Sequence, residues 1–427
     1  MTSSDIHPQG RGHREADIPA YLQDELAPAE RSAFEKHLAA CPSCTAETAK
    51  YRNLLARLAA PLPEIPPRDL APEVLARIAK PERLRWPSFA PVILRAAAIL
   101  LCLVLAGVVL SRLRPAPAAS PTPRDRCVGA ALGWLHESQE PQGNWDAEKW
   151  GAQQNYTPGI TALAVLAFLR QEPDALQGAH ADVVRRGLDY LLKQQTAEGR
   201  FGILCSGTPY NQGLATLALL KAGRLRNDPR WTEAAGRALA YIRSTQLESG
   251  GWGYPRTAGD SGNTSITAWQ LQALLEAEAA GGHDVRPCIE KGLAWIGKMM
   301  AAEGRVGYTR PGDFPNGHLT LTAAATVCLL QDPKADARSE QLSRVIRALC
   351  LDAGQETGVD YYRYYFLAQA LRAAKSDVTG PVVSRLQESL LACQTRDGAA
   401  AGSCTATDPW TAAGGRVYAT AMAVLAM

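Results

Sequence analysis

The chain has little net charge, few aromatic residues and few runs of β-branched residues. Its 427 residues include 45 basic and 42 acidic side chains, which give a formal net charge of +3, and aromatic residues make up 7%. So small a charge gives no general argument for nucleic-acid binding. Alanine and leucine are abundant, which favours an all-α protein. The length exceeds that of one ordinary hydrophobic core and predicts two or three domains.

The N-terminus lacks an apolar signal segment, because residues 1–16 are polar. The one strong hydrophobic stretch lies inside the chain and reads FAPVILRAAAILLCLVLAGVVL. If Arg95 snorkels to the interface, this stretch is long enough for a transmembrane helix, which we place at 89–111. A buried core helix is the alternative. A linker with a short helix, 61–88, precedes the stretch, and a proline-rich linker, 112–126, follows it.

The cysteines are unevenly distributed along the chain. Cys41 and Cys44 form a close pair, and seven others are scattered between Cys127 and Cys404. Scattered cysteines in a helical domain are usually small buried hydrophobes, although a Cys393–Cys404 disulfide can form if that domain lies outside the cytoplasm.

A metal site is predicted by the spacing His37-x3-Cys41-x2-Cys44. His37 and Cys41 are four residues apart and share one helix face, and Pro42 suits the first turn of a new helix. Three such ligands at a helix junction suit tetrahedral Zn²⁺. His13 is the first candidate for the fourth ligand, and His7 is the alternative. A metal-free thiol pair is the competing interpretation, but a segment of about 60 residues with few large apolar side chains folds poorly without a staple.

The sequence around this site resembles the zinc-finger domain of bacterial anti-sigma factors. The matching features lie in residues 20–44: Tyr21-Leu22, Glu25-Leu26, Glu30-Arg31, His37-Leu38, Cys41 and Cys44. The resemblance implies a zinc-binding domain at 1–60 whose small helical bundle, with the helix that follows it, occludes a sigma factor. Reduced thiolate ligands favour placing this domain in the cytoplasm. With the expected span, that predicts a single-pass protein of the bacterial inner membrane whose C-terminal domain lies outside the cytoplasm.

Residues 127–427 repeat with a period near 50. Each unit has an amphipathic helix, a glycine-rich turn and a second helix of small apolar residues. The clearest turns read QGNW, EGRFG, SGGWGY and EGRVGY, and asparagines such as Asn211 and Asn263 near the second helices are candidate N-caps. We count six helical hairpins, and the apolar final helix favours closure of the last hairpin against the first.

These hairpins resemble the prenyltransferase and squalene-cyclase repeat family, in which inner helices of an α/α toroid line a central cavity. The fold class expected for the whole chain is therefore all-α, with a zinc-clipped domain, one transmembrane helix and this toroid. The catalytic signatures of the family are missing. The chain has no Asp-x-Asp-Asp acid motif, and its Asp-x-Cys segment, Asp125-Arg126-Cys127, lies at the wrong end of the toroid. We therefore expect no cyclase activity.

The most distinctive local sequence is VDYYRYYFLAQA, residues 359–370. Asp360 is a candidate helix cap, and part of the tyrosine cluster can face a cavity if the helix is an inner one. Asp360, Tyr361, Tyr364 and Tyr365 are therefore candidate ligand-binding residues. The alternative is that these tyrosines pack the toroid, with their hydroxyls satisfied at its rim.

Three functions are compatible with these features. The first is an anti-sigma-like regulator, in which the zinc domain binds a sigma factor and the toroid binds a ligand or a protein partner. The second is a terpenoid-cyclase-like enzyme with an unrecognised acid. The third is a structural adaptor with a docking module at each end.

Overall fold

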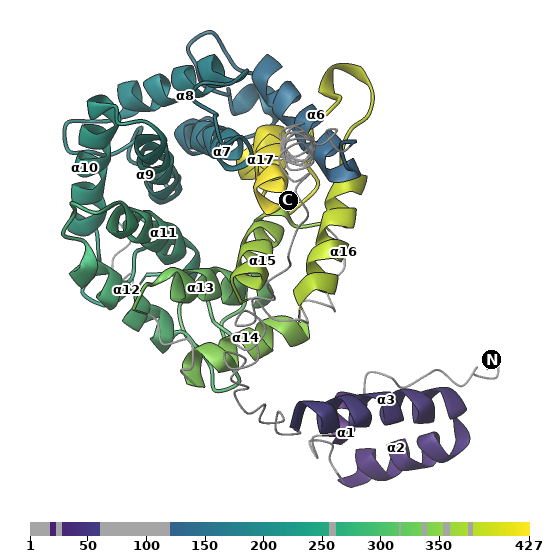
Figure 1. Ribbon diagram of the computed structural model, residues 1–427. Helices are drawn as coiled ribbons and strands as arrows, with labels where there is room; N and C mark the ends of the chain where they lie inside the picture. The colour runs from purple at the N-terminus through teal and green to yellow at the C-terminus, as the bar shows by residue number, and fades with distance from the viewer. Residues whose placement is uncertain are drawn as a thin grey trace, which may run out of the picture. The chain divides into compact units, whose positions relative to one another are not determined.

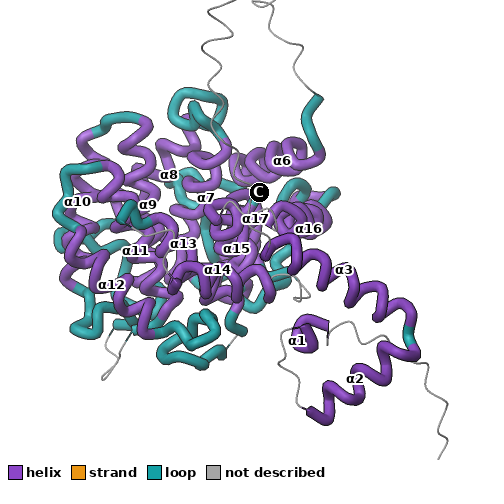
Figure 2. The backbone as a smooth tube through the Cα atoms, turned by 60° about the horizontal axis from the view of Figure 1, so that its bottom comes forward, coloured by secondary structure: helices purple, strands orange, loops and turns teal. Residues whose placement is uncertain are grey.

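The computed structural model describes residues 18–22, 28–59, 120–255, 262–315, 317–334, 340–352, 359–374 and 379–427. Within these ranges the regular elements are helices, apart from isolated β-bridges. Figure 2 shows the helices joined by loops rather than strands. The chain divides into two compact units, Met1–Arg114 and Pro115–Met427. The all-helical part of the expected fold is confirmed.

The expected membrane span is not supported, and we correct both the fold class and the localisation that included it. No helix among the described residues is long and apolar enough to cross a bilayer. The strongly apolar helices α7 (Thr157–Gln171) and α13 (Leu319–Gln331) have 15 and 13 residues. They therefore rise only about 20 Å, against the roughly 30 Å of a hydrocarbon core. Segment 89–111 itself lies outside the described residues.

The N-terminal unit contains three described helices: α1 (Ile18–Leu22), α2 (Pro28–Ala40) and α3 (Pro42–Ala59). Helices α2 and α3 each begin at a proline, whose missing N–H costs nothing at a first helical position. Pro42 cannot continue α2, so Cys41 lies between the two helices. The aromatic ring of Tyr21 packs 5.1 Å from that of the fully buried Phe34.

The C-terminal unit is an α/α toroid (Figure 1). The outer helices are α6 (Pro123–Glu137), α8 (Ala181–Gln194), α10 (Pro229–Ser244), α12 (Arg286–Lys298), α14 (Glu340–Asp352) and α16 (Thr379–Ala392). The inner helices are α7, α9 (Thr208–Leu225), α11 (Thr264–Ala280), α13, α15 (Tyr361–Ala374) and α17 (Thr411–Ala426). Short 3₁₀ turns are η2 (Glu148–Trp150), η3 (Gln154–Tyr156) and η4 (Gly398–Ala400). Consecutive inner helices pack together, and α17 packs against α7, so the inner layer closes.

The two layers follow from two residue patterns. Outer helix α8 is amphipathic: Val184, Leu188 and Leu191 are fully buried, whereas Asp182 and Lys193 are exposed. Inner helix α7 is buried at every position from Thr157 to Phe168. A helix with apolar residues on all sides is stable only when protein surrounds it.

One hydrogen-bonding pattern links neighbouring hairpins and also closes the toroid. A glutamine just after an outer helix donates its side-chain amide to a turn glycine and to a carbonyl of the next outer helix. Gln246 donates to Gly250 at 2.8 Å and to Cys288 of α12 at 2.9 Å. Gln139 and Gln195 make the same pair of bonds. In the last hairpin, Gln394 donates to Gly402 and back to Cys127 of the first helix, α6, both at 2.8 Å. The predicted toroid, closed by its last hairpin, is therefore confirmed.

Candidate functional site

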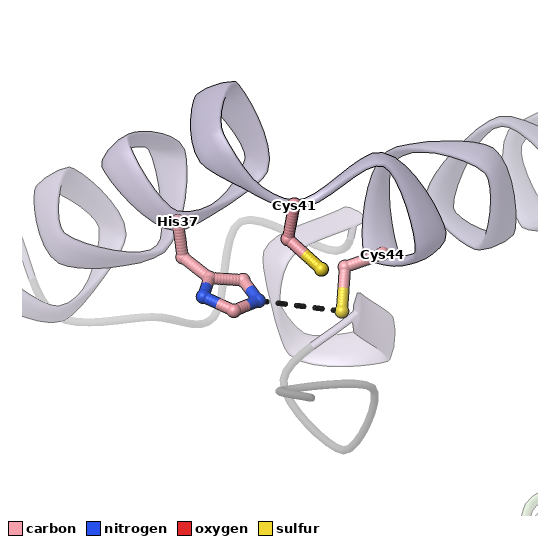
Figure 3. Close-up of side chains that lie close together, drawn as sticks. All are labelled: His37, Cys41 and Cys44. Carbon is pink, nitrogen blue, oxygen red and sulfur yellow. Dashed lines mark hydrogen bonds between the residues drawn. The ribbon is translucent and has the colours of Figure 1, made fainter. Parts of the chain in front are cut away.

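The first candidate site is the junction between α2 and α3. His37 lies in the last turn of α2, Cys41 lies between the helices, and Cys44 lies in the first turn of α3. The break at Pro42 turns the chain so that Cys44 comes back towards the face that carries His37 (Figure 3). The Thr45 hydroxyl donates to the carbonyls of Leu38 and Cys41, at 2.6 and 3.0 Å, which ties the end of α2 to the start of α3.

The three side chains converge on one point. One ligand atom of each, the imidazole nitrogen and the two sulfurs, lies within 4.8 Å of the others. Nε2 of His37 is 3.3 Å from Sγ of Cys44. Zinc–ligand bonds of about 2.0–2.3 Å hold tetrahedral ligand atoms roughly 3.5–3.8 Å apart. The imidazole and the two thiols lie close to these separations and offer three of the four ligands of a tetrahedral zinc site.

The surroundings of the cluster support a fixed geometry. Cys44 is fully buried, and its carbonyl accepts a 2.7 Å hydrogen bond from the buried Thr48 hydroxyl. The His37 imidazole stacks on Phe34, with a 6.3 Å separation between ring centroids. Among the described residues, this is the one cluster of His, Cys, Asp and Glu with a metal-binding arrangement. His13 and His7 lie outside those residues, so the fourth ligand stays a prediction.

The second candidate site is a cavity of about 460 Å³ among the inner helices, near their N-terminal ends. Aromatic side chains form much of its wall: Tyr156, Tyr210, Tyr254, Trp269, Tyr308, Tyr362, Trp410 and Tyr418. Aliphatic side chains from four inner helices complete it: Ile160, Leu163, Leu214, Leu321 and Met422. No acidic or basic side chain is among these lining residues. The volume falls in the range of small-molecule sites, about 300–1,000 Å³.

The structure places a different tyrosine of α15 in this wall from those singled out by the sequence. Tyr362 lines the cavity, whereas Tyr361, Tyr364 and Tyr365 do not. Tyr361 is fully buried and donates to the carbonyl of Thr405 at 2.7 Å. Tyr365 stacks on Trp269 and donates to Oε1 of Gln272 at 3.2 Å. Tyr364 is buried, with the Arg363 guanidinium 5.6 Å from the centre of its ring.

Sequence reasoning missed most of the aromatic wall, although the repeats contain a signal for it. Tyr254 and Tyr308 follow a glycine in the recurring turn, and Tyr156 and Tyr210 adjoin the Thr-Pro pair that begins an inner helix. Tyrosines at recurring positions of this kind point towards one end of a toroid. The tyrosines at 361–365 are closely spaced in sequence, but this spacing does not indicate which of them line the cavity.

A chain of hydroxyl groups runs along one side of the cavity. The Trp269 indole N–H donates to the Tyr362 hydroxyl at 2.8 Å, and that hydroxyl is 2.7 Å from Oγ of Ser265. Ser265 is in turn 3.5 Å from the Tyr210 hydroxyl, which is 3.4 Å from that of Tyr254. Burial raises the pKa of Tyr210 and of Tyr362. These phenols therefore stay neutral at physiological pH.

Two buried carboxylates, Asp360 and Asp408, lie behind the wall at the start of α15 and α17. Asp408 accepts from the Tyr361 backbone N–H at 3.0 Å, the Tyr418 hydroxyl at 3.1 Å and the Thr411 hydroxyl at 2.8 Å. Asp360 caps α15 by accepting from the Arg363 N–H at 2.9 Å. Burial raises the pKa of Asp408; its hydrogen bond from Thr411 opposes this, and the nearby Asp360 adds to it. Donors at helix N-termini thus satisfy both carboxylates.

Comparison with known protein families supports the zinc centre. A family model described as "Putative zinc-finger" matches residues 15–45, the segment that holds His37, Cys41 and Cys44. The rest of the chain lies outside this match.

Two curated relatives are cyclases. The chain is 32% identical, over 136 residues, to a terpene cyclase-glycosyl transferase fusion protein of Humicola fuscoatra, which is 30% of this chain and 10% of that protein. It is 29% identical, over 145 residues, to the squalene–hopene cyclase of Zymomonas mobilis, which is 31% of this chain and 21% of that enzyme. The chain therefore spans only a small part of either relative.

Solved structures share the fold. An α-1,6-mannanase of Salegentibacter sp. superposes with a TM-score of 0.55 at 10% identity, over 70% of this chain and 97% of that one. A cellobiose 2-epimerase of Spirochaeta thermophila gives 0.52 at 13% identity, over 73% and 98%. At such identities the likeness shows the toroidal fold alone.

Proposed function

We propose that this chain is an anti-sigma-like regulator, in which a zinc-clipped N-terminal unit binds a sigma factor and the toroid binds a small ligand. The observation that carries the proposal is the convergence of His37, Cys41 and Cys44 within 4.8 Å, in the segment that matches the zinc-finger model. Zinc at this point holds α2 and α3 together in a unit whose buried core is small. Among the described residues of the unit, the buried side chains are few, namely Ile18, Phe34, Cys44 and Thr48, so zinc binding and folding are expected to be coupled.

The sigma-factor part of the proposal rests on the resemblance of residues 20–44 to anti-sigma domains and on the exposed surface of α2. Residues Ser32, Glu35, Lys36 and Ala39 are exposed, so much of the helix is available to a partner. A sigma factor that docks on helices fixed by zinc must lose affinity when the zinc ligands are removed. Zinc binding and partner binding are therefore linked.

The ligand part of the proposal rests on the cavity. It is of small-molecule size, and six helices surround it. A ligand can regulate partner binding only if it favours one of two states of the protein.

A second candidate function is a terpenoid-cyclase-like enzyme, which the local similarity to two cyclases favours. Against it, the chain lacks the Asp-x-Asp-Asp motif, and among the described residues no carboxyl lines the cavity. Asp360 and Asp408 lie behind the wall and accept hydrogen bonds from helix N-termini. Incubation of the purified chain with squalene should therefore give no cyclic product, and a cyclic product would favour the enzyme instead.

Co-purification tests the regulator directly. The tagged full-length chain, expressed in a bacterium, should retain a sigma factor, and Cys41→Ser and Cys44→Ser should each lose it. Ser43→Ala is the matched control, because Ser43 is exposed and lies between the two cysteines. Absence of any sigma factor from the wild-type sample, or its equal retention by the cysteine variants, would refute the proposal and favour a structural adaptor.

A further inference from the structure

We propose that Cys127 and Cys404 form a disulfide bond that fastens the first hairpin of the toroid to the last. Cys127 lies in α6, and Cys404 follows the glycine-rich turn of the last hairpin. Both are free thiols in the structure. Helix α6 packs against α16 and α17 (Figure 1), so the two cysteines lie on either side of the line where the toroid closes. The proposal concerns how the toroid is held closed and does not depend on the regulator function.

The backbone of the last turn places Cys404 opposite Gln394. The two residues form an antiparallel β-bridge. Backbone hydrogen bonds between the residues on either side, 2.8 and 3.0 Å long, frame the bridge. In this arrangement Gln394 and Cys404 are a non-hydrogen-bonded pair, whose side chains lie close together on one face. The side chain of Cys404 therefore lies beside that of Gln394.

That face is the one turned towards Cys127. The Gln394 side-chain amide donates to the Cys127 carbonyl at 2.8 Å. In the same turn, a Cβ added at Gly402 would meet the carbonyl of Ala130, which lies about one helical turn beyond Cys127 in α6. Cys404 is fully buried, and Cys127 is 4% exposed. Burial raises the pKa of Cys404, and negative charge at Cys127 raises it further, as expected for two sulfurs that lie near each other.

Cys393 is less suited to be the partner of Cys404. Its thiol donates to the Ser389 carbonyl of α16 at 3.1 Å. The Tyr361 hydroxyl of α15 lies within hydrogen-bonding reach of the same sulfur. Cys393 also adjoins Gln394 in the chain, and neighbours in an extended segment point to opposite faces. The Cys393–Cys404 pairing that the sequence allows is therefore less favourable than the pairing across the closure.

Two recurring positions of the repeats are both cysteine only at the closure, among the hairpins that the structure describes. One is the residue whose backbone N–H donates to a threonine hydroxyl of the following inner helix: Trp145, Trp252, Val306 and Cys404. The other is the outer-helix residue whose carbonyl accepts from a glutamine side chain: Val183, Ala234, Cys288 and Cys127. The hairpin that meets Cys288 carries Trp252, so no second thiol is present there. Elsewhere, then, these two positions hold no pair of thiols.

A disulfide compound such as oxidised glutathione can supply the oxidation. One cysteine thiolate attacks the glutathione disulfide, which forms a mixed disulfide and releases one glutathione thiolate. The second cysteine thiolate attacks the mixed disulfide, which forms the Cys127–Cys404 bond and releases the second glutathione thiolate. The two electrons lost by the cysteines reduce one glutathione disulfide, and their two protons go to the glutathione thiolates. Because burial protects both thiols, the reaction occurs during folding or when the closure opens.

Peptide mapping tests the pairing in the full-length chain. The reduced chain is unfolded in urea and refolded in a buffer of reduced and oxidised glutathione, and the remaining thiols are alkylated. Trypsin then places Cys127, Cys393 and Cys404 in three separate peptides, 127–149, 386–396 and 397–416. The expected product links the first of these peptides to the third. Absence of this product, or a larger yield of the link between the second and the third, would overturn the proposal.

Matched variants show whether the bond fastens the toroid. Cys127→Ala and Cys404→Ala should each lose the linked product, whereas Cys393→Ala should keep it at the wild-type yield. Circular dichroism checks that each variant is helical. The oxidised wild type should need about 1 M more urea for unfolding than the reduced wild type, because the bond restricts a very long loop of the unfolded chain. Cys127→Ala should show no such shift. Equal urea midpoints for the oxidised and reduced wild type, or an equal shift in Cys127→Ala, would overturn the fastening role.

Discussion

The closure of the toroid depends on Gln394, and its removal should destabilise the C-terminal unit. Gln394→Ala deletes two 2.8 Å hydrogen bonds, one to Gly402 in its own turn and one to Cys127 of the first helix. Each such bond contributes about 1 kcal/mol, so the free energy of unfolding should fall by about 2 kcal/mol. The second bond joins residues 267 positions apart, and it exists only if the last hairpin meets the first.

The matched control is Gln246→Ala, which deletes the same two bonds between neighbouring hairpins inside the repeat array, to Gly250 and Cys288. Urea unfolding followed by circular dichroism should give similar losses for both variants. In an open array Gln394 keeps only its local bond to Gly402, so Gln394→Ala should then cost about 1 kcal/mol, half the loss for Gln246→Ala. That result would refute the closed toroid.

Three further changes test other parts of the structure. Gly402→Ala should lower the free energy of unfolding by about 1–3 kcal/mol, because the φ of Gly402 is 91° and an added Cβ would meet the Ala130 carbonyl. Gly398 also has a positive φ but has open space around it, so Gly398→Ala should lower the free energy of unfolding by less. Burial raises the pKa of Cys127 to about 11. Iodoacetamide at pH 8 should therefore alkylate this thiol far more slowly in the native chain than in urea, which mass spectrometry can measure. Equal alkylation rates would contradict the burial of Cys127. A zinc chelator added to the native chain should make Cys41 and Cys44 reactive without exposing Cys127, and alkylation that is unaffected by chelation would count against bound metal.

The toroid could be predicted because its repeats encode the same local structure several times. Asn263 illustrates a prediction from one residue: its side chain caps α11 by accepting from the Ile266 N–H at 2.9 Å. Asn211 lies at the corresponding place in sequence but within α9, where it accepts from the Gly159 N–H of α7 at 2.9 Å. A cap and a contact between helices use the same amide group, and only the position of the neighbouring helix distinguishes them.

Helix α15 also shows that local sequence predicts a helix cap but does not predict which face of the helix contacts its neighbours. Asp360 caps the helix as predicted, because capping depends on the chain within three residues. The choice of Tyr362 over Tyr361 as the cavity residue depends on how α15 is rotated against α11, and successive residues on a helix differ by about 100°. The closely spaced tyrosines identify α15 as a candidate inner helix, but they do not determine which of its faces lines the cavity.

The apolar stretch at 89–111 misled the sequence analysis for a related reason. Hydropathy measures the composition of a segment, and among the described residues the apolar helices, such as α7 and α13, are buried in the interior of the toroid. The spacing of His37, Cys41 and Cys44 was more informative, because a helix, a proline and a second helix leave few ways to arrange three side chains.

Zinc content, measured by mass spectrometry of the purified full-length chain, tests the central claim most directly. The structure predicts one zinc per chain in the wild type and in Ser43→Ala, and almost none in Cys41→Ser or Cys44→Ser. A wild-type chain that folds without metal, or a Cys41→Ser chain that keeps its zinc, would contradict the metal centre on which the regulator is built.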